Sequence, residues 1–156
     1  EAIERVAAGV PEAVVGAGTV VTPDQARAAA GAGARFLVSP GCTDALASAM
    51  ADTGLPFLPG VSTVSEAMAL LERGVSEMKF FPAEAAGGAA FLKSLTGPLP
   101  QVRFCPTGGI TADSAPAYLA LPNVGCVGGS WLTPADAVAS GAWERITDLA
   151  GRAAAL

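Results

Sequence analysis

The 156-residue sequence predicts an α/β fold, a (β/α)8 TIM barrel represented here by about six C-terminal βα units, and three observations lead to it. Short apolar runs alternate with stretches of helical spacing, and the run midpoints recur about every 20–25 residues, the rhythm of parallel βα units. The runs are continuous rather than alternating, as in strands covered on both faces. Small, polar or Gly/Pro residues follow one run after another, and these strand ends are the face where a barrel builds its site. A doubly wound sheet would gather such residues at one switch point instead, so the barrel is favoured.

Six apolar runs are expected to be buried strands with helices between them. The expected strands are residues 13–16, 36–39, 57–59, 78–81, 102–105 and 124–127. The expected helices begin near residues 22, 43, 63, 86, 111 and 133, and several of these starts carry capping residues or a proline in the first turn. Residues 1–8 supply the end of a preceding helix and residues 143–155 a closing one. No linker or composition shift interrupts the chain, so residues 1–156 are expected to form one barrel domain, incomplete at its N-terminus.

The composition excludes several classes of function. With 51% hydrophobic and 15% charged residues, the chain is not a disordered segment. Its formal net charge is −5 with nine Lys plus Arg, so neither nucleic acid nor an anionic membrane surface is an expected partner. The sequence has no histidine, which excludes Ser-His-Asp and Cys-His machinery and His-ligated zinc. Proton transfer or covalent chemistry therefore falls to carboxylates, Lys, Tyr, Thr, Ser or Cys.

The three cysteines indicate a reducing compartment. Cys42, Cys105 and Cys126 are an odd number at wide spacings with no CxxC pair. We expect reduced, mostly buried thiols in a cytoplasmic protein rather than a disulfide framework. No apolar run approaches the ~18 residues that a membrane span needs, so no membrane association is expected.

Lys79 is the residue best suited to covalent chemistry. With a side-chain period of two, Glu77, Lys79 and Phe81 share one face of their strand, while Met78 and Phe80 point to the other. Met78 and Phe80 suit packing against helices, which places Lys79 inside the barrel. A lysine there is costly unless it is paired or its pKa is lowered, and a lowered pKa is what an amine needs to attack a carbonyl near neutral pH. The alternative is a structural lysine that pairs with Glu77 or extends to the barrel mouth.

Two glycine-rich strand ends predict a phosphate site. Thr107-Gly108-Gly109 follows one expected strand and Gly128-Gly129-Ser130 the next. Glycines let backbone N–H groups approach an anion, hydroxyls add donors, and helix starts follow both loops. Barrel phosphate sites are built from the loops after strands 7 and 8, so the six expected strands would be strands 3 to 8. The alternative is that both segments are simple turns.

Three further residues are less informative. Thr19, at another strand end, is suited to hydrogen-bond a substrate carboxylate or carbonyl, or simply to cap the next helix. Arg103 lies in an expected strand and receives no catalytic role. Lys93, the only other lysine, lies in an expected helix and is interpreted as a solvated surface charge.

The ordered motifs resemble a known family over nearly the whole chain. They are residues 14–20 (VVGAGTV), 39–41 (SPG), 59–63 (PGVST), 79–84 (KFFPAE), 103–110 (RFCPTGGI) and 128–132 (GGSWL). They look like the class I aldolases that cleave 2-keto-3-deoxy-6-phosphogluconate (KDPG) or 4-hydroxy-2-oxoglutarate (KHG).

The resemblance implies roles for particular residues. Lys79 would form the Schiff base, Thr19 and Pro40 would line the pyruvate half of the pocket, and Phe81 would pack near the imine. The substrate phosphate would be held by Thr107, Gly108, Gly109, Gly129 and Ser130. The implied reaction is reversible cleavage of KDPG to pyruvate and glyceraldehyde 3-phosphate. It needs no metal or organic cofactor, because the imine supplies the electrophile, and the resemblance implies a homotrimer.

The sequence departs from the family in one respect. The resemblance implies a complete barrel, in which an acid/base glutamate and a carboxylate-binding arginine lie on a strand just before the helix that opens this sequence. That strand is not among the 156 residues. We expect the chain to be part of a longer polypeptide whose first two βα units are deleted, lie upstream or come from another chain. Glu84 is the only carboxylate shortly beyond Lys79 and is disfavoured as a substitute base. Two alternatives stay open, namely a phosphate-binding scaffold without turnover and a phosphosugar isomerase with a carboxylate base.

Overall fold

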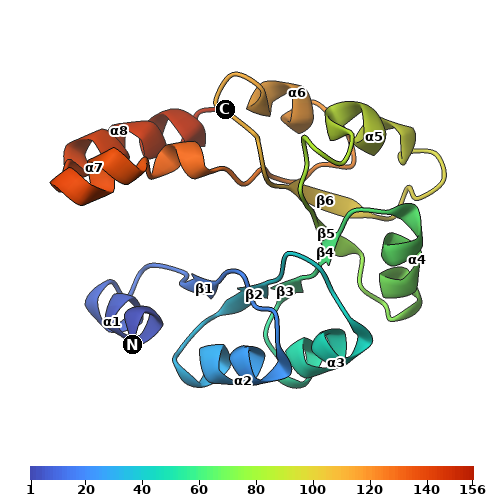
Figure 1. The fold of residues 1–156 in the computed structure, drawn as a ribbon, viewed down its shortest axis with the longest axis horizontal. Coiled ribbons are helices and arrows are strands. Elements are labelled where there is room, and N and C mark those ends of the chain that lie inside the picture. The colour runs from blue at the N-terminus through green and yellow to red at the C-terminus, as the bar shows by residue number, and fades with distance from the viewer. The chain divides into compact units, whose positions relative to one another are not determined.

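The computed structural model describes residues 1–156, and the chain divides into two compact units, Glu1–Phe81 and Pro82–Leu156 (Figure 1). The first unit contains α1 (Ala2–Gly9), β1 (Gly16–Ala17), α2 (Pro23–Gly31), β2 (Phe36–Val38), α3 (Asp44–Asp52), β3 (Phe57–Leu58), β4 (Gly60–Val61), α4 (Val64–Glu72) and β5 (Glu77–Phe80). The second contains α5 (Gly88–Ser94), β6 (Arg103–Pro106), α6 (Ala115–Leu119), the 3₁₀ helix η1 (Ser130–Leu132), α7 (Ala135–Ser140) and α8 (Trp143–Ala154). The predicted α/β class is confirmed. None of the helices has the length and apolar character that crossing a membrane requires.

The strands of the first unit pair in parallel. β1 pairs with β2, β2 with β3, and β4 with β5. Only Pro59 separates β3 from β4. Residues 57–58 pair with β2, and residues 60–61 pair with β5. Proline has no N–H to give to a ladder, which explains the interruption.

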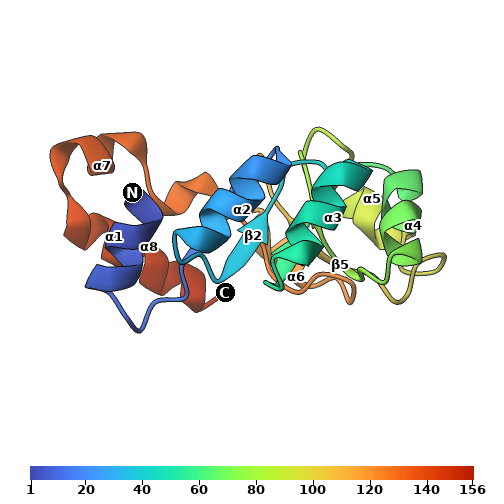
Figure 2. The ribbon, with the colours of Figure 1, turned by 90° about the horizontal axis from the view of Figure 1, so that it is seen from below.

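The core of the first unit is built from small residues on α2 and larger ones on the strands and α3. Its buried members are Ala17, Val20, Ala26, Ala29, Ala34, Leu37, Leu46 and Met50. α2 and α3 contact each other and cover the same side of β1–β3 (Figures 1 and 2). The alanines of α2 let this helix lie close to the sheet. This packing matches the continuous apolar strands of the sequence, which indicate burial against helices.

Three helices of this unit begin where the sequence predicts, because a threonine caps each of them. The side chains of Thr22, Thr43 and Thr63 each accept a hydrogen bond of 3.2 Å from the amide three residues later. Such a bond satisfies one of the donors that a helix start leaves open.

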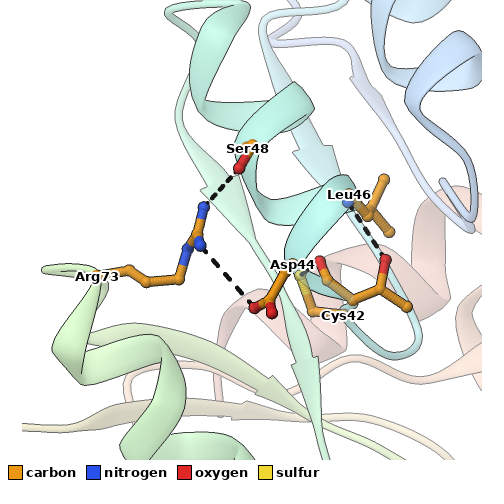
Figure 3. Close-up of polar contacts among 6 residues, drawn as sticks. Cys42, Asp44, Leu46, Ser48 and Arg73 are labelled. Carbon is orange, nitrogen blue, oxygen red and sulfur yellow. Dashed lines mark hydrogen bonds and ion pairs between the residues drawn. The ribbon is translucent and has the colours of Figure 1, made fainter.

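Arg73 joins α4 to α3 (Figure 3). It stands just past the end of α4, donates to Ser48 Oγ at 2.7 Å and lies 3.9 Å from the Asp44 carboxylate. The Asp44 side chain is 95% exposed, so solvent screens the ion pair and the hydrogen bond is the more specific contact.

The second unit departs from the expected elements in two places. Residues 124–127, expected as a strand, form no regular strand, and residues 124–128 make only the isolated parallel bridges Phe104↔Val124 and Thr107↔Gly128. Between these bridges, residues 104–107 lie opposite residues 124–128, which have one residue more. A regular ladder of hydrogen bonds therefore cannot form there. α6 begins at Ala115 rather than near Thr111, because Thr111 and Ser114 hydrogen-bond each other in a turn.

The cap of α4 gives a stability prediction. The amide of Thr63 donates to Glu66 at 2.9 Å in return for the bond that its side chain accepts, and the Ser62 amide, by donating to Glu66, lowers the pKa of that carboxyl. We expect Thr63→Ala to lower the free energy of unfolding by about 1 kcal/mol, measured by urea denaturation. Ser65→Ala, in the same turn, is the control, and equal stabilities of the two variants would contradict the prediction.

Candidate active site

Lys79 is buried on β5. It is 9% exposed, and its neighbours Met78 and Phe80 are 0% and 1% exposed. Its amide donates to the carbonyl of Pro59 at 2.9 Å, which fixes the backbone, and its Nζ lies 4.6 Å from the centre of the Phe81 ring. The structure thus places two of the predicted site residues, Lys79 and Phe81, in contact.

The loop after β2 is clamped against the strand that pairs with Lys79. Gly60 is the register partner of Lys79, and its amide donates to the buried Ser39 Oγ at 3.2 Å. A Cβ at Gly60 would overlap the backbone of Pro40 and Gly41, so only glycine permits this approach. Pro40 therefore lies one strand from the strand of Lys79, held by main-chain contact.

Thr19 lies in a strained turn at the end of β1. Its φ is +59°, and it is the only non-glycine residue with positive φ in the chain. For a β-branched residue such a conformation costs about 1–3 kcal/mol and is typical of functional sites. The chain then returns to the sheet, since Val20 donates to the carbonyl of Val38 at 3.0 Å.

The structure does not bring Thr19 and Pro40 into one cleft. Thr19 lines a cleft of ≈ 370 Å³ with Gln25 and Ile3, whereas Pro40 lines one of ≈ 380 Å³ with Leu46 and Glu66. Their predicted shared role in the pyruvate half stays a prediction.

The loop after β6 presents two adjacent amides. The carbonyls of Thr107 and Gly108 accept from the amides of Ala83 (2.8 Å) and Glu84 (3.1 Å). Because a trans peptide points its C=O and N–H in opposite directions, the amides of Gly108 and Gly109 face away from the Ala83–Glu84 segment. Both glycines have positive φ, +101° and +80°. Paired amides of this kind form an anion-binding concavity.

The second predicted phosphate loop lies beside the first. Thr107 bridges to Gly128, where a Cβ would lie 2.7 Å from Thr107 Oγ1. A Cβ at Gly129 would overlap the ring of Trp131. Gly109 and Ser130 line a common cleft of ≈ 540 Å³ with Trp131 and the start of α7. The second unit therefore brings the five predicted phosphate-binding residues into two neighbouring loops.

Sequence reasoning missed one contact in this unit. Tyr118, which is 2% exposed on α6, donates to a carboxylate oxygen of Glu84 at 2.5 Å. Thirty-four residues separate the two, and no motif links them, so no sequence signal could have found the pair.

The expectation of mostly buried thiols is wrong. Cys42 and Cys105 are half-buried, and Cys126 is exposed. Arg103 is exposed beside Gly125, and Lys93 is exposed on α5, as expected for a surface charge.

An α/β fold with glycine-rich strand ends is typical of enzymes, and a buried lysine on a parallel strand is suited to the class that uses an amine as nucleophile. A family model described as "KDPG and KHG aldolase" matches residues 1–149. The chain belongs to this family of aldehyde-lyases.

Individual relatives agree with the family. The KHG/KDPG aldolase of Escherichia coli K12 is 52% identical over 153 residues, which cover 98% of this chain and 72% of that protein. A KDPG aldolase structure from Legionella pneumophila, with pyruvate captured as a covalent carbinolamine intermediate, is 49% identical with a TM-score of 0.93, and the match covers 95% of this chain and 72% of that one. The Zymomonas mobilis KDPG aldolase with 3-phosphoglycerate is 46% identical with a TM-score of 0.88, covering 97% and 71%.

The cysteines give a prediction about reactivity. A hydrogen bond from Cys105 lowers the pKa of Cys126 to about 6, whereas burial raises the pKa of Cys42. The reactive thiolate is therefore favoured at Cys126 and disfavoured at Cys42. We expect iodoacetamide to alkylate Cys126 first, as read by peptide mass spectrometry. Cys126→Ser should abolish the fast phase, and alkylation of Cys42 at an equal rate would refute the assignment.

Proposed function

We propose that this chain is a class I aldolase that cleaves KDPG to pyruvate and glyceraldehyde 3-phosphate through a Schiff base on Lys79. The burial of Lys79, which is 9% exposed and has its Nζ 4.6 Å from the centre of the Phe81 ring, carries the proposal. Burial opposes the protonated form of an amine and so favours the nucleophilic one. Family membership and the covalent pyruvate intermediate of the Legionella relative support it.

The steps follow from the chemistry of an imine. The neutral amine of Lys79 attacks the 2-keto carbon, and water leaves as one proton is taken up from solvent, which gives a protonated imine. The C4 hydroxyl gives its proton back to solvent, the C3–C4 bond breaks, and its electron pair passes into the imine to form an enamine while the aldehyde departs. Protonation at C3 and hydrolysis then release pyruvate and restore the amine. The imine is the electron sink, so the proposal requires no metal or organic cofactor.

The other site residues are proposed to bind the two ends of the substrate. Thr19, Pro40 and Phe81 would line the pyruvate half. The phosphate half would use the amides of Gly108, Gly109 and Gly129 and the hydroxyls of Thr107 and Ser130. The paired amides after β6 support this assignment, because a phosphate would satisfy donors that bond to no other group in the structure.

A finer architecture belongs to the same proposal. We propose that the chain forms a single TIM-barrel domain of about six βα units, in the cytoplasm. The family resemblance implies an acid/base glutamate and a carboxylate-binding arginine, and no residue of this chain is proposed for either role. Glu84 is a poor substitute base, since its carboxylate already accepts a hydrogen bond from Tyr118.

The Schiff base gives the decisive test. Borohydride reduction in the presence of pyruvate should leave a stable adduct on the peptide that contains Lys79, read by mass spectrometry. Lys79→Ala should abolish the adduct and aldol cleavage, while Lys93→Ala, which removes the other lysine, should leave both intact. An adduct on Lys93 would refute the assignment. Phosphate-ester binding without any pyruvate adduct would favour the scaffold, and cleavage that survives in Lys79→Ala would favour an isomerase-like carboxylate mechanism.

The proposed homotrimer has a test of its own. Sedimentation equilibrium of the chain, whose mass is 15.4 kDa, should give three times that mass. A monomer at micromolar concentration would overturn the trimer without affecting the assignment of Lys79.

A further inference from the structure

We propose that Glu84 and Tyr118 act together as positioning residues that hold Gly108 and Gly109 in the conformation that binds substrate phosphate. The inference rests on the proposed function, because it concerns the phosphate half of that site. Neither side chain is required to touch the substrate. Their role is to hold the backbone that does.

Glu84 contacts the phosphate loop in two ways. Its amide donates to the carbonyl of Gly108 at 3.1 Å, which turns the amide of Gly109 to the opposite side. Its side-chain stem lies against Gly109, where a Cβ would stand 2.7 Å from Glu84 Cγ and 2.8 Å from Glu84 Cβ. Gly109 also has a φ of +80°, a conformation that side chains disfavour. The stem of Glu84 therefore packs directly on the backbone whose amide faces the proposed phosphate.

Tyr118 fixes the side chain of Glu84. Its ring is 2% exposed in the core of the second unit, so it offers a rigid anchor, and its hydroxyl donates to Glu84 Oε1 at 2.5 Å. Burial, followed by the bond to Glu84, raises the pKa of Tyr118, so the hydroxyl keeps the proton that it donates. An exposed glutamate alone would sample several rotamers, whereas this bond selects one.

The same bond has an electrostatic consequence. A carboxylate that moved freely beside Gly109 would repel a dianionic phosphate. The hydrogen bond from the Tyr118 hydroxyl holds the Glu84 carboxylate in one place. Loss of the bond should thus loosen the loop and release a like charge near the ligand, and both effects weaken phosphate binding.

Inorganic phosphate is the direct probe. In the full chain labelled with ¹⁵N, titration should shift the amide resonances of Gly108 and Gly109 and give a dissociation constant. We expect Tyr118→Phe to raise that constant about tenfold, the effect of losing one hydrogen bond to a charged group. Glu84→Ala should raise it by less, because it loosens the loop but also removes the like charge. Glu84→Gln keeps an acceptor for Tyr118 and should recover most of the affinity. Ser94→Ala, which removes an exposed hydroxyl on α5, is the matched control.

Substrate choice separates positioning from general damage. Tyr118→Phe should raise KM for KDPG but not for its dephosphorylated analogue, 2-keto-3-deoxygluconate, and should leave trapping of pyruvate on Lys79 unchanged. Equal phosphate affinity in wild type and Tyr118→Phe would overturn the inference, and so would an equal defect with both substrates. Failure of wild type to trap pyruvate on Lys79 would count against the aldolase function, while the phosphate titration would still decide the role of Glu84 and Tyr118.

Discussion

The burial of one amine is the constraint on which the site depends. A lysine costs free energy in an apolar setting, so the strands around it have to hold it there. The hydrogen bond from the Lys79 amide to the Pro59 carbonyl and the pairing of Lys79 with Gly60 supply that support. The amide of Gly60 in turn donates to the side chain of Ser39, so hydrogen bonds across three neighbouring segments hold the strand that carries Lys79. The Phe81 ring beside Nζ offers its face to the cationic form, which opposes the effect of burial.

Glycine sets the geometry of the strand ends by leaving side chains out. At Gly60 the backbone of Pro40 and Gly41, in the loop after β2, occupies the space where a Cβ would stand, and at Gly109 the stem of Glu84 occupies it. At Gly128 that space belongs to Thr107, and at Gly129 to Trp131. Each of these contacts brings a backbone or a side chain closer to the glycine than a residue with a Cβ would allow. The conformation of the strand ends therefore depends on neighbours that pack directly against glycine backbone. Most hydrogen-bond donors there are backbone amides, and polar side chains supply only a few.

Local chemistry explains which features the sequence could predict. The starts of α2, α3 and α4 follow from a threonine cap, which acts within four residues, and the burial of Lys79 follows from the apolar residues beside it. Features that depend on distant partners were not predictable. Residues 124–127 look like a strand, but an extra residue between two bridges breaks the ladder. The positive φ of Thr19 breaks the preference of its residue type, and only the observed backbone reveals it.

The two halves of the proposed site use opposite physical means, and this explains where sequence patterns point clearly to chemistry. An amine nucleophile needs removal from water, so its signature is a charge within an apolar run, visible at Lys79. A phosphate needs donors that are already oriented, so its signature is Gly-Gly, which shows that a backbone is free to approach but not what holds it in place. In the second unit that support comes from Glu84 and Tyr118, on segments far apart in the sequence. Positioning residues of an anion site are consequently harder to find from sequence than the nucleophile. The groups that they orient are backbone amides, which every residue except proline carries.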